Sequence, residues 1–186
     1  MKAVLRSVKP YWLYLILTGK KTIEVGKSCP RAKDWNKVVE MYCSKDMRSF
    51  NRIPEEDKEW MRKYLGKVIG EFVCGKVTPL VPLGLRGFEV LDETLKAMCL
   101  TTDDLNVYGG LKTLYGWHIS QLKIYDKPKP LDEFYIRCRI SDKKCRLCDN
   151  CFEREDSYGR YYAVKKLTRP PQSWCYVQEL EDSNDK

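Results

Sequence analysis

Residues 19–25 read Gly-Lys-Lys-Thr-Ile-Glu-Val and stand between a predicted helix and a predicted strand. Upstream, Pro10 suits the first turn of a helix that runs to Thr18, and Gly19 ends that helix. From residue 21 to residue 25, polar and apolar side chains alternate, which predicts a strand with one polar and one apolar face. The segment therefore predicts a helix, a turn and a half-buried strand in succession.

Further strands and short helices are predicted on both sides of this segment. The strands are expected over residues 2–8, 37–43, 67–77, 117–120, 122–125, 161–164 and 174–177, and the helices over 54–65, 92–98 and 102–106. A doubly wound parallel sheet needs a regular alternation of strand and helix, which this pattern lacks. We therefore expect an α+β protein with a mostly antiparallel, curled sheet or small barrel and helical insertions.

The size and composition of the chain indicate one packed unit. It has 186 residues, of which 43% are hydrophobic, enough for a sizeable core. The longest apolar stretch, from Tyr11 to Leu17, is much shorter than the roughly 20 residues that cross a bilayer. Arg6 and Lys9 stand where a signal peptide would carry its apolar region. We therefore expect a cytosolic protein without a membrane span.

The net charge of +8 is concentrated in two separate segments. Residues 1–37 hold nine lysines and arginines against two acidic residues, and residues 137–169 hold ten against five. If the fold brings the two segments together, they form one basic face that attracts phosphate backbones. The alternative is a solvated surface that has no nucleic-acid partner.

Four motifs resemble those of a known family. They are Gly-Lys-Lys-Thr-Ile-Glu-Val at 19–25, Gly-Lys-Val-Ile-Gly-Glu-Phe at 66–72, Tyr-Gly-Trp-His-Ile at 115–119 and Pro-Pro-Gln-Ser-Trp-Cys-Tyr-Val at 170–177. The first resembles the signature of ASCH domains, a branch of the PUA-like superfamily. The other three look like a subfamily found in Gram-positive bacteria and their phages. The resemblance covers roughly residues 1–135 and 173–180.

This resemblance implies a fold and a site. The fold would be a PUA-like, mostly antiparallel β-barrel with helical insertions, and its cleft, lined by the signature, would bind RNA or a nucleotide. We expect a single domain over residues 1–180, with a cysteine-rich insertion at about 138–160 and a flexible tail at 181–186. Some relatives resemble amidohydrolases that act on acylated nucleosides, and others ribonucleases. In the amidohydrolase branch a threonine follows the signature lysine three residues later, whereas this chain has Glu24 there.

Lys21 and Glu24 are the predicted centre of the site and its candidate catalytic residues. Lys21 is suited to bind a phosphate, or to act as a base if burial lowers its pKa. Glu24 is suited to accept hydrogen bonds from the amino edge of a base, or to polarise a water molecule. The predicted nucleic-acid-binding set comprises Lys20, Lys21, Thr22, Glu24, Lys27, Trp117 and His118. Trp117 would stack on an unpaired base, together with Trp12 and Tyr115.

Each of these residues also has a purely structural interpretation. Lys21 would be a solvated lysine at a strand end, and Glu24 would form an ion pair with Lys27 or Lys20. Trp117 would be a core aromatic, and His118, the only histidine, would be a hydrogen-bonded core residue. Besides RNA or nucleotide binding, two other functions therefore remain: hydrolysis of a modified nucleoside or of RNA, and docking of a protein partner through the cysteine-rich loop.

Four of the nine cysteines form one compact cluster. Cys145, Cys148 and Cys151 follow one another at a spacing of two intervening residues, and Cys138 lies upstream. Closely spaced thiolates in a charged loop are typical of a structural zinc site, which takes four ligands. We expect zinc on these four cysteines, with Cys175 or Cys29 as alternative fourth ligands. Uncoordinated reduced thiols are the other interpretation, because thiols stay reduced in the cytosol.

Overall fold

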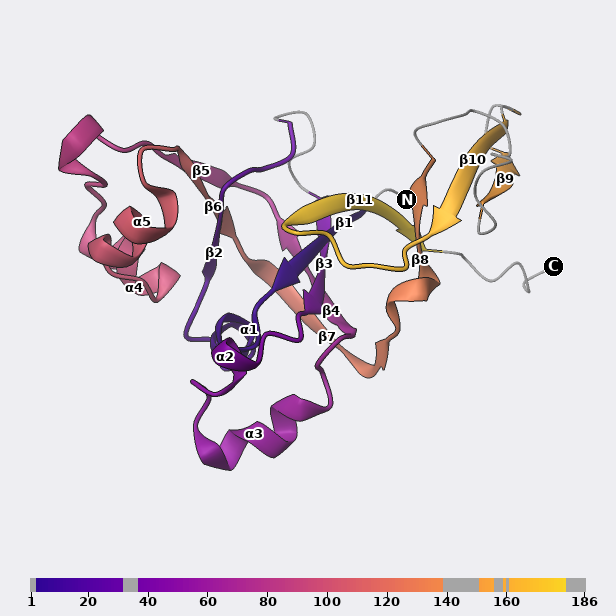
Figure 1. Ribbon diagram of the computed structural model, residues 1–186, viewed down its shortest axis with the longest axis horizontal. Coiled ribbons are helices and arrows are strands. Elements are labelled where there is room, and N and C mark those ends of the chain that lie inside the picture. Colours follow the sequence, from indigo (N-terminus) through magenta and orange to yellow (C-terminus); the bar gives the residue numbers. More distant parts are fainter. Residues whose placement is uncertain (1–2, 32–36, 139–150, 156–158, 160, 180–186) are drawn as a thin grey trace.

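The computed structural model describes residues 3–31, 37–138, 151–155, 159 and 161–179. Within these ranges the strands are β1 (Ala3–Val8), β2 (Ile23–Gly26), β3 (Lys37–Cys43), β4 (Val68–Cys74), β5 (Val77–Leu80), β6 (Leu114–His118), β7 (Ser120–Lys129), β8 (Phe134–Arg137), β9 (Cys151–Glu155), β10 (Tyr161–Lys166) and β11 (Trp174–Glu179). The helices are α1 (Pro10–Leu17), α2 (Met47–Phe50), α3 (Glu55–Arg62), α4 (Asp92–Met98) and α5 (Thr102–Gly109). Figure 1 shows their arrangement.

The strands form two sheets rather than a barrel. The larger sheet has the order β7-β4-β3-β1-β11-β8-β10-β9, and the smaller one has the order β2-β6-β5. Strand β1 pairs in parallel with β3 and antiparallel with β11, so the larger sheet is mixed. Its last two strands, β10 and β9, project away from the other strands (Figure 1).

The predicted PUA-like β-barrel is therefore wrong, whereas the α+β class is confirmed. A barrel closes when the two outermost strands of a sheet pair with each other. In the described ranges the outermost strands are β7 and β9, and they lie at opposite ends of the strand order. Strands β9 and β10 extend the sheet beyond β8, and β2, β5 and β6 form a sheet of their own.

Helix α1 covers one face of the larger sheet. It begins at Pro10, as predicted, and buries Leu13, Leu15 and Ile16 in the main hydrophobic core. That core also contains Val4 of β1 and further side chains of β3 and β4. The opposite face of the sheet carries a separate core, which includes Leu5, Tyr42, Val68, Phe134, Leu167 and Val177. Strand β1 is thus covered on both faces, which leaves little access to water for its side chains.

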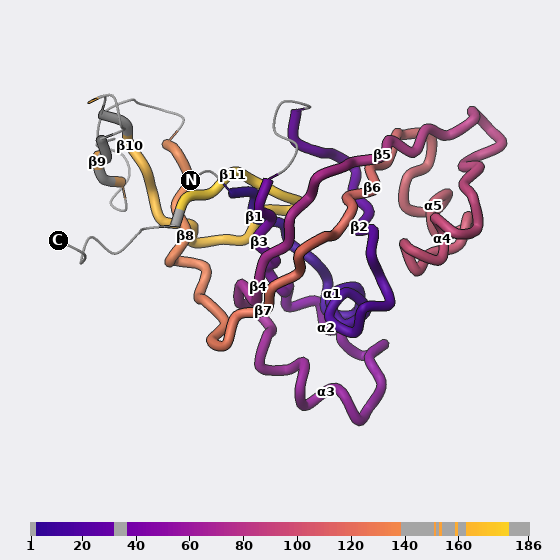
Figure 2. The backbone as a smooth tube through the Cα atoms, turned by 180° about the vertical axis from the view of Figure 1, so that it is seen from behind, coloured from indigo at the N-terminus to yellow at the C-terminus, as the bar shows by residue number. Residues whose placement is uncertain are grey.

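Helices α4 and α5 pack on the smaller sheet. Their Met98 and Leu105 share a core with Ile23, Val25 and Leu114 of β2 and β6. Seen from behind, the smaller sheet lies between these two helices and the larger sheet (Figure 2). Among the helices of the described ranges, none combines the length and the apolar character needed to span a membrane.

Candidate functional site

A cavity of about 650 Å³ lies where the end of β1, α1, β2, α5 and the segment 170–173 meet. Its lining includes four basic side chains, those of Arg6, Lys9, Lys21 and Lys27, and three acidic ones, those of Glu24, Asp103 and Asp104. Apolar and aromatic side chains also line it, namely Val8, Trp12, Val25, Leu100, Val107 and Tyr108. The cavity therefore combines fixed charges of both signs with flat apolar surface.

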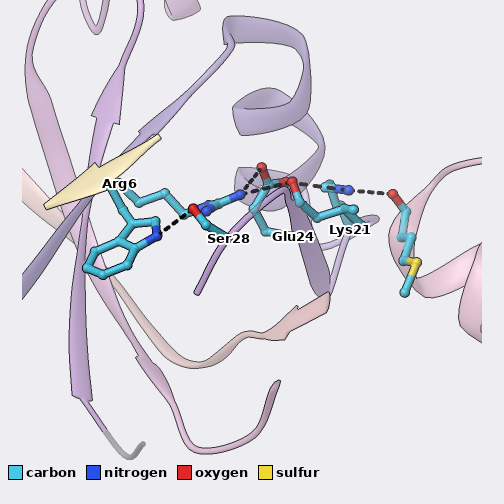
Figure 3. Close-up of polar contacts among 7 residues, drawn as sticks. Arg6, Lys21, Glu24 and Ser28 are labelled. Carbon is cyan, nitrogen blue, oxygen red and sulfur yellow. Dashed lines mark hydrogen bonds and ion pairs between the residues drawn. The ribbon is translucent and has the colours of Figure 1, made fainter. Parts of the chain in front are cut away.

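Three buried charged side chains form what we call the floor of the cavity: Arg6, Glu24 and Lys21 (Figure 3). Their exposed fractions are only 3%, 7% and 2%, respectively. Arg6 Nη2 lies 3.3 Å from Glu24 Oε1, and Lys21 Nζ lies 3.5 Å from Glu24 Oε2. One carboxylate thus stands between two cations, and the floor carries a net positive charge.

Further contacts fix the two cations of the floor. Arg6 Nη2 donates to the backbone oxygen of Val25 at 2.9 Å, and its guanidinium lies 4.6 Å from the centre of the Trp117 ring. Lys21 Nζ donates to the backbone oxygen of Met98, the last residue of α4. Carbonyls in the last turn of a helix lack partners within the helix and attract cations. Both cations of the floor are therefore held by backbone oxygens as well as by Glu24.

Backbone hydrogen bonds connect the two residues before β2 to two helices and thereby position the motif at 19–25. Lys21 N donates to the backbone oxygen of Leu15 in α1, and Thr22 N donates to that of Ala97 in α4, both at 2.9 Å. At the other end of β2, a Cβ on Gly26 would lie 2.7 Å from Arg6 Nη2. A side chain there would displace the guanidinium, so glycine is the residue that lets β2 approach Arg6 this closely.

Burial changes the acid–base behaviour of Lys21. Removal of its ammonium group from water lowers the pKa of Lys21, and the nearby Glu24 carboxylate opposes this effect only in part. Lys21 therefore loses its proton at a lower pH than an exposed lysine. This is the condition under which lysine acts as a base, which is one of the two roles that the sequence predicts for Lys21.

The wall of the cavity is aromatic and partly exposed. Lys27, which directly follows β2, and Tyr108 of α5 both line the cavity, and Lys27 Nζ lies 4.6 Å from the centre of the Tyr108 ring. Two cations lie near the Trp12 ring, with Lys21 Nζ at 5.2 Å and the Arg52 guanidinium at 4.9 Å from its centre. Val107, which is 89% exposed, adds apolar surface at the entrance. Planar rings beside cations are features that bind nucleotides.

The structure separates the predicted binding set into two groups. Lys21, Glu24 and Lys27 line the cavity, whereas Lys20, Thr22, Trp117 and His118 are not among its lining residues. Glu24 does form an ion pair, but its partners are Arg6 and Lys21 rather than the expected Lys27 or Lys20.

Three of the four residues outside the lining have other side-chain contacts. Trp117 is buried beneath Arg6 and supports the floor from below. The Nε2 atom of His118 lies 2.9 Å from the hydroxyl of Thr78, and burial together with Lys76 lowers the pKa of His118. Lys20 Nζ lies 5.8 Å from the centre of the Tyr14 ring on α1.

Sequence reasoning missed Arg6, Tyr108 and the segment 170–173 as parts of the site. Arg6 stands in a mainly apolar predicted strand, Val4-Leu5-Arg6-Ser7-Val8, and this composition could have indicated a buried charge in need of a partner. Tyr108 carries no such local signal. The segment 170–173 belongs to the motif at 170–177, but nothing in that motif places it beside α5, because only the fold brings α5 and the approach to β11 together.

Two predictions reach beyond the described residues. Cys138 and Cys151 are buried against Ala163 of β10, but Cys145 and Cys148 lie outside the described residues, so the zinc site stays a prediction. In the part of the chain that the structure describes, no group of three or more metal-binding side chains is found. The convergence of the two basic segments also stays a prediction, because Lys143, Lys144, Arg146 and Arg160 lie outside the described residues.

Comparisons with known proteins concern the fold. No protein-family model and no curated protein matches the sequence. Among solved structures, the chain is similar to the crystal structure of ASCH from Zymomonas mobilis, with 14% identity, a TM-score of 0.54, and coverage of 95% of this chain and 87% of that chain. A mutant form of the same protein gives 14% identity, a TM-score of 0.52, and coverage of 95% and 88%. The resemblance drawn from the sequence is thus confirmed at the level of architecture, and the chain has an ASCH-type fold.

Proposed function

We propose that the cavity binds an RNA nucleotide, with its phosphate near the basic side chains and its base against the aromatic wall. The observation that carries this proposal is the buried, net positive floor of Arg6, Glu24 and Lys21 beside the exposed rings of the wall. A positive floor in a low-dielectric site attracts an anion, and rings attract the flat face of a base. We include in the same proposal that the chain belongs to the ASCH family and to its bacterial and phage subfamily, and that the protein is cytosolic.

The dimensions and the hydrogen-bonding capacity of the cavity support this ligand. Its volume of about 650 Å³ falls within the roughly 300–1,000 Å³ typical of small-molecule sites. Each carboxylate oxygen accepts about two hydrogen bonds. With one contact to each oxygen from the floor cations, Glu24 retains capacity to accept from an amino group of a base. Lys9 and Lys27 stand where they would meet phosphates.

The salt dependence of binding tests the role of these two lysines. We expect Lys9→Ala and Lys27→Ala each to lower the slope of log affinity against log salt for hexauridylate by about one unit, because one fewer counterion is released. Lys63→Ala is the matched control, since this lysine is exposed at the end of α3 and does not line the cavity. Equal slopes for all three variants and the parent would contradict binding in the cavity.

Hydrolysis in the same cavity is the second candidate, and one observation favours it. The lowered pKa of Lys21 allows its neutral amine to accept a proton from a water molecule or a ribose hydroxyl that attacks the substrate. In that case Lys21→Met abolishes turnover of an RNA or a modified nucleoside and leaves part of the binding. A protein-docking role of the cysteine-rich loop predicts neither binding nor turnover of nucleotides.

We also propose a structural zinc ion on Cys138, Cys145, Cys148 and Cys151. Protein purified without chelator is expected to hold about one zinc per chain, because structural sites take four ligands and bind tightly. Cys148→Ser should release the metal, which elemental analysis measures. Cys43→Ser is the control, because this buried thiol lies in the main core on β3. Metal-free protein with a cooperative unfolding transition unchanged by chelator would contradict the proposal.

A further inference from the structure

Two aromatic side chains on β11 form a surface beside the cavity, which we call the aromatic strip: Trp174 and Tyr176. Trp174 is partly exposed, and Tyr176 is 36% exposed. Their rings meet edge to face, with centres 5.3 Å apart. Trp174 also meets the buried Trp117 at 6.3 Å, and its Nε1 donates to Ser28 Oγ at 3.0 Å. The strip is therefore held in a fixed orientation by the residues beneath and beside it.

The strand register places the strip on the same face of the sheet as the floor. Arg6 of β1 stands directly opposite Trp174, and Val4 stands opposite Tyr176. Opposite residues of an antiparallel pair point to the same face. Trp117 accordingly contacts both the Arg6 guanidinium and the Trp174 ring. The strip thus lies on β11 beside β1, and its Trp174 stands next to the buried Arg6 of the floor.

The chain also connects the strip to the rim of the cavity at two points. Residues 170–173 line the cavity, and Trp174 follows them directly. Lys27 lines the cavity as well, and the next residue, Ser28, accepts the hydrogen bond from Trp174. Trp174 is therefore next in the chain to one part of the lining and hydrogen-bonded to the neighbour of another, so a ligand that leaves the cavity past Lys27 meets Trp174 next.

We propose that the ligand is a single-stranded RNA rather than a free nucleotide, with one nucleotide in the cavity and the next stacked on Trp174 and Tyr176. This inference rests on the proposed function and extends it to a class of ligand. Partly exposed rings on a rigid strand next to a basic rim are a feature that binds successive bases, because every base offers an aromatic face. A duplex does not fit this arrangement, since its bases are already stacked on one another.

The test compares ligand length and strip variants. Fluorescein-labelled hexauridylate and hexaadenylate are titrated by anisotropy at low salt, and uridine and adenosine 5′-monophosphates serve as competitors. We expect Trp174→Leu and Tyr176→Ala each to weaken hexanucleotide binding by about 5- to 100-fold and to leave mononucleotide binding unchanged. Trp60→Leu is the matched control: Trp60 is 37% exposed and meets two rings edge to face, those of Tyr14 and Tyr64, far along the chain from the cavity lining.

The other outcomes overturn the inference in distinct ways. If hexanucleotides bind the parent no better than mononucleotides do, the strip has no role although the cavity binds its ligand. If Trp174→Leu weakens both ligands equally, it acts through Trp117 and Arg6 and not by stacking. If DNA hexamers bind as tightly as RNA, or the parent self-associates and Trp174→Leu does not, the occupant is not RNA. If no nucleotide binds at all, the proposed function fails first.

Discussion

Replacement of Glu24 by alanine should lower the free energy of unfolding by about 3–5 kcal/mol, because it leaves two buried cations without their shared carboxylate. Arg6 Nη2 and Lys21 Nζ lie 3.3 Å and 3.5 Å from the two oxygens of Glu24, and all three side chains are buried. Denaturant titration of Glu24→Ala and of the parent measures this difference.

Two further variants separate charge from shape. Glu24→Gln keeps hydrogen-bonding capacity but leaves the same uncompensated positive charge, so we expect it to be destabilised as well. The double variant Lys21→Met with Glu24→Gln removes one cation together with the carboxylate, and it should recover part of the stability. A single Glu24→Ala variant within about 0.5 kcal/mol of the parent would show that the floor is not a coupled charge network.

Replacement of Lys21 by methionine should weaken binding of a phosphate-bearing ligand by about 10- to 100-fold, the usual range for one lost hydrogen bond to a charged group. Methionine fills a similar volume, and the Arg6–Glu24 ion pair remains, so the fold should persist. Titration of hexauridylate against both proteins measures the loss. Equal affinity would place Lys21 outside the binding site.

The pH dependence of the parent follows from the lowered pKa of Lys21. Because the unfolded chain binds this proton more tightly, the Lys21 contribution to stability rises with pH between the folded and the unfolded pKa. If charged Lys21 attracts a phosphate, ligand affinity should fall as pH rises through the folded pKa. If neutral Lys21 acts as a base, turnover should instead rise through the same pKa. Lys21→Met should show neither the fall in ligand affinity nor the rise in turnover.

Local patterns predicted most elements because their signals are local. The helix at Pro10, the strand at 37–43 and the helix at 92–98 appear as predicted, since proline at the first turn and β-branched runs act within a few residues. Helix α2 and strands β5, β8 and β9 were missed, because segments of four or five residues carry little periodicity of their own. The barrel was wrong because closure depends on which strands end a sheet, and no single segment carries that information.

The lining of the cavity follows from the sequence only in part, for the same reason. Lys21 and Glu24 stand three residues apart in one motif, and the structure brings them together in an ion pair. Arg6 joins them from β1, and Met98 and Tyr108 join from two helices more than 70 residues further along. These partners meet only through tertiary packing. Trp117 and His118 were also predicted for the site, and they lie in β6 opposite Glu24 and Ile23. Their side chains, however, contact Arg6 and Thr78 rather than the cavity.

Blocking the entrance of the cavity tests the central claim most directly. Val107→Trp places a large side chain at an 89% exposed position of the lining and leaves the floor untouched. Val81→Trp is the matched control, at a 60% exposed position that does not line the cavity. If the cavity holds the nucleotide, titration with hexauridylate should show binding reduced by at least about tenfold in Val107→Trp and unchanged in Val81→Trp, with both variants as stable as the parent. Equal affinity of Val107→Trp and the parent would contradict binding in this cavity.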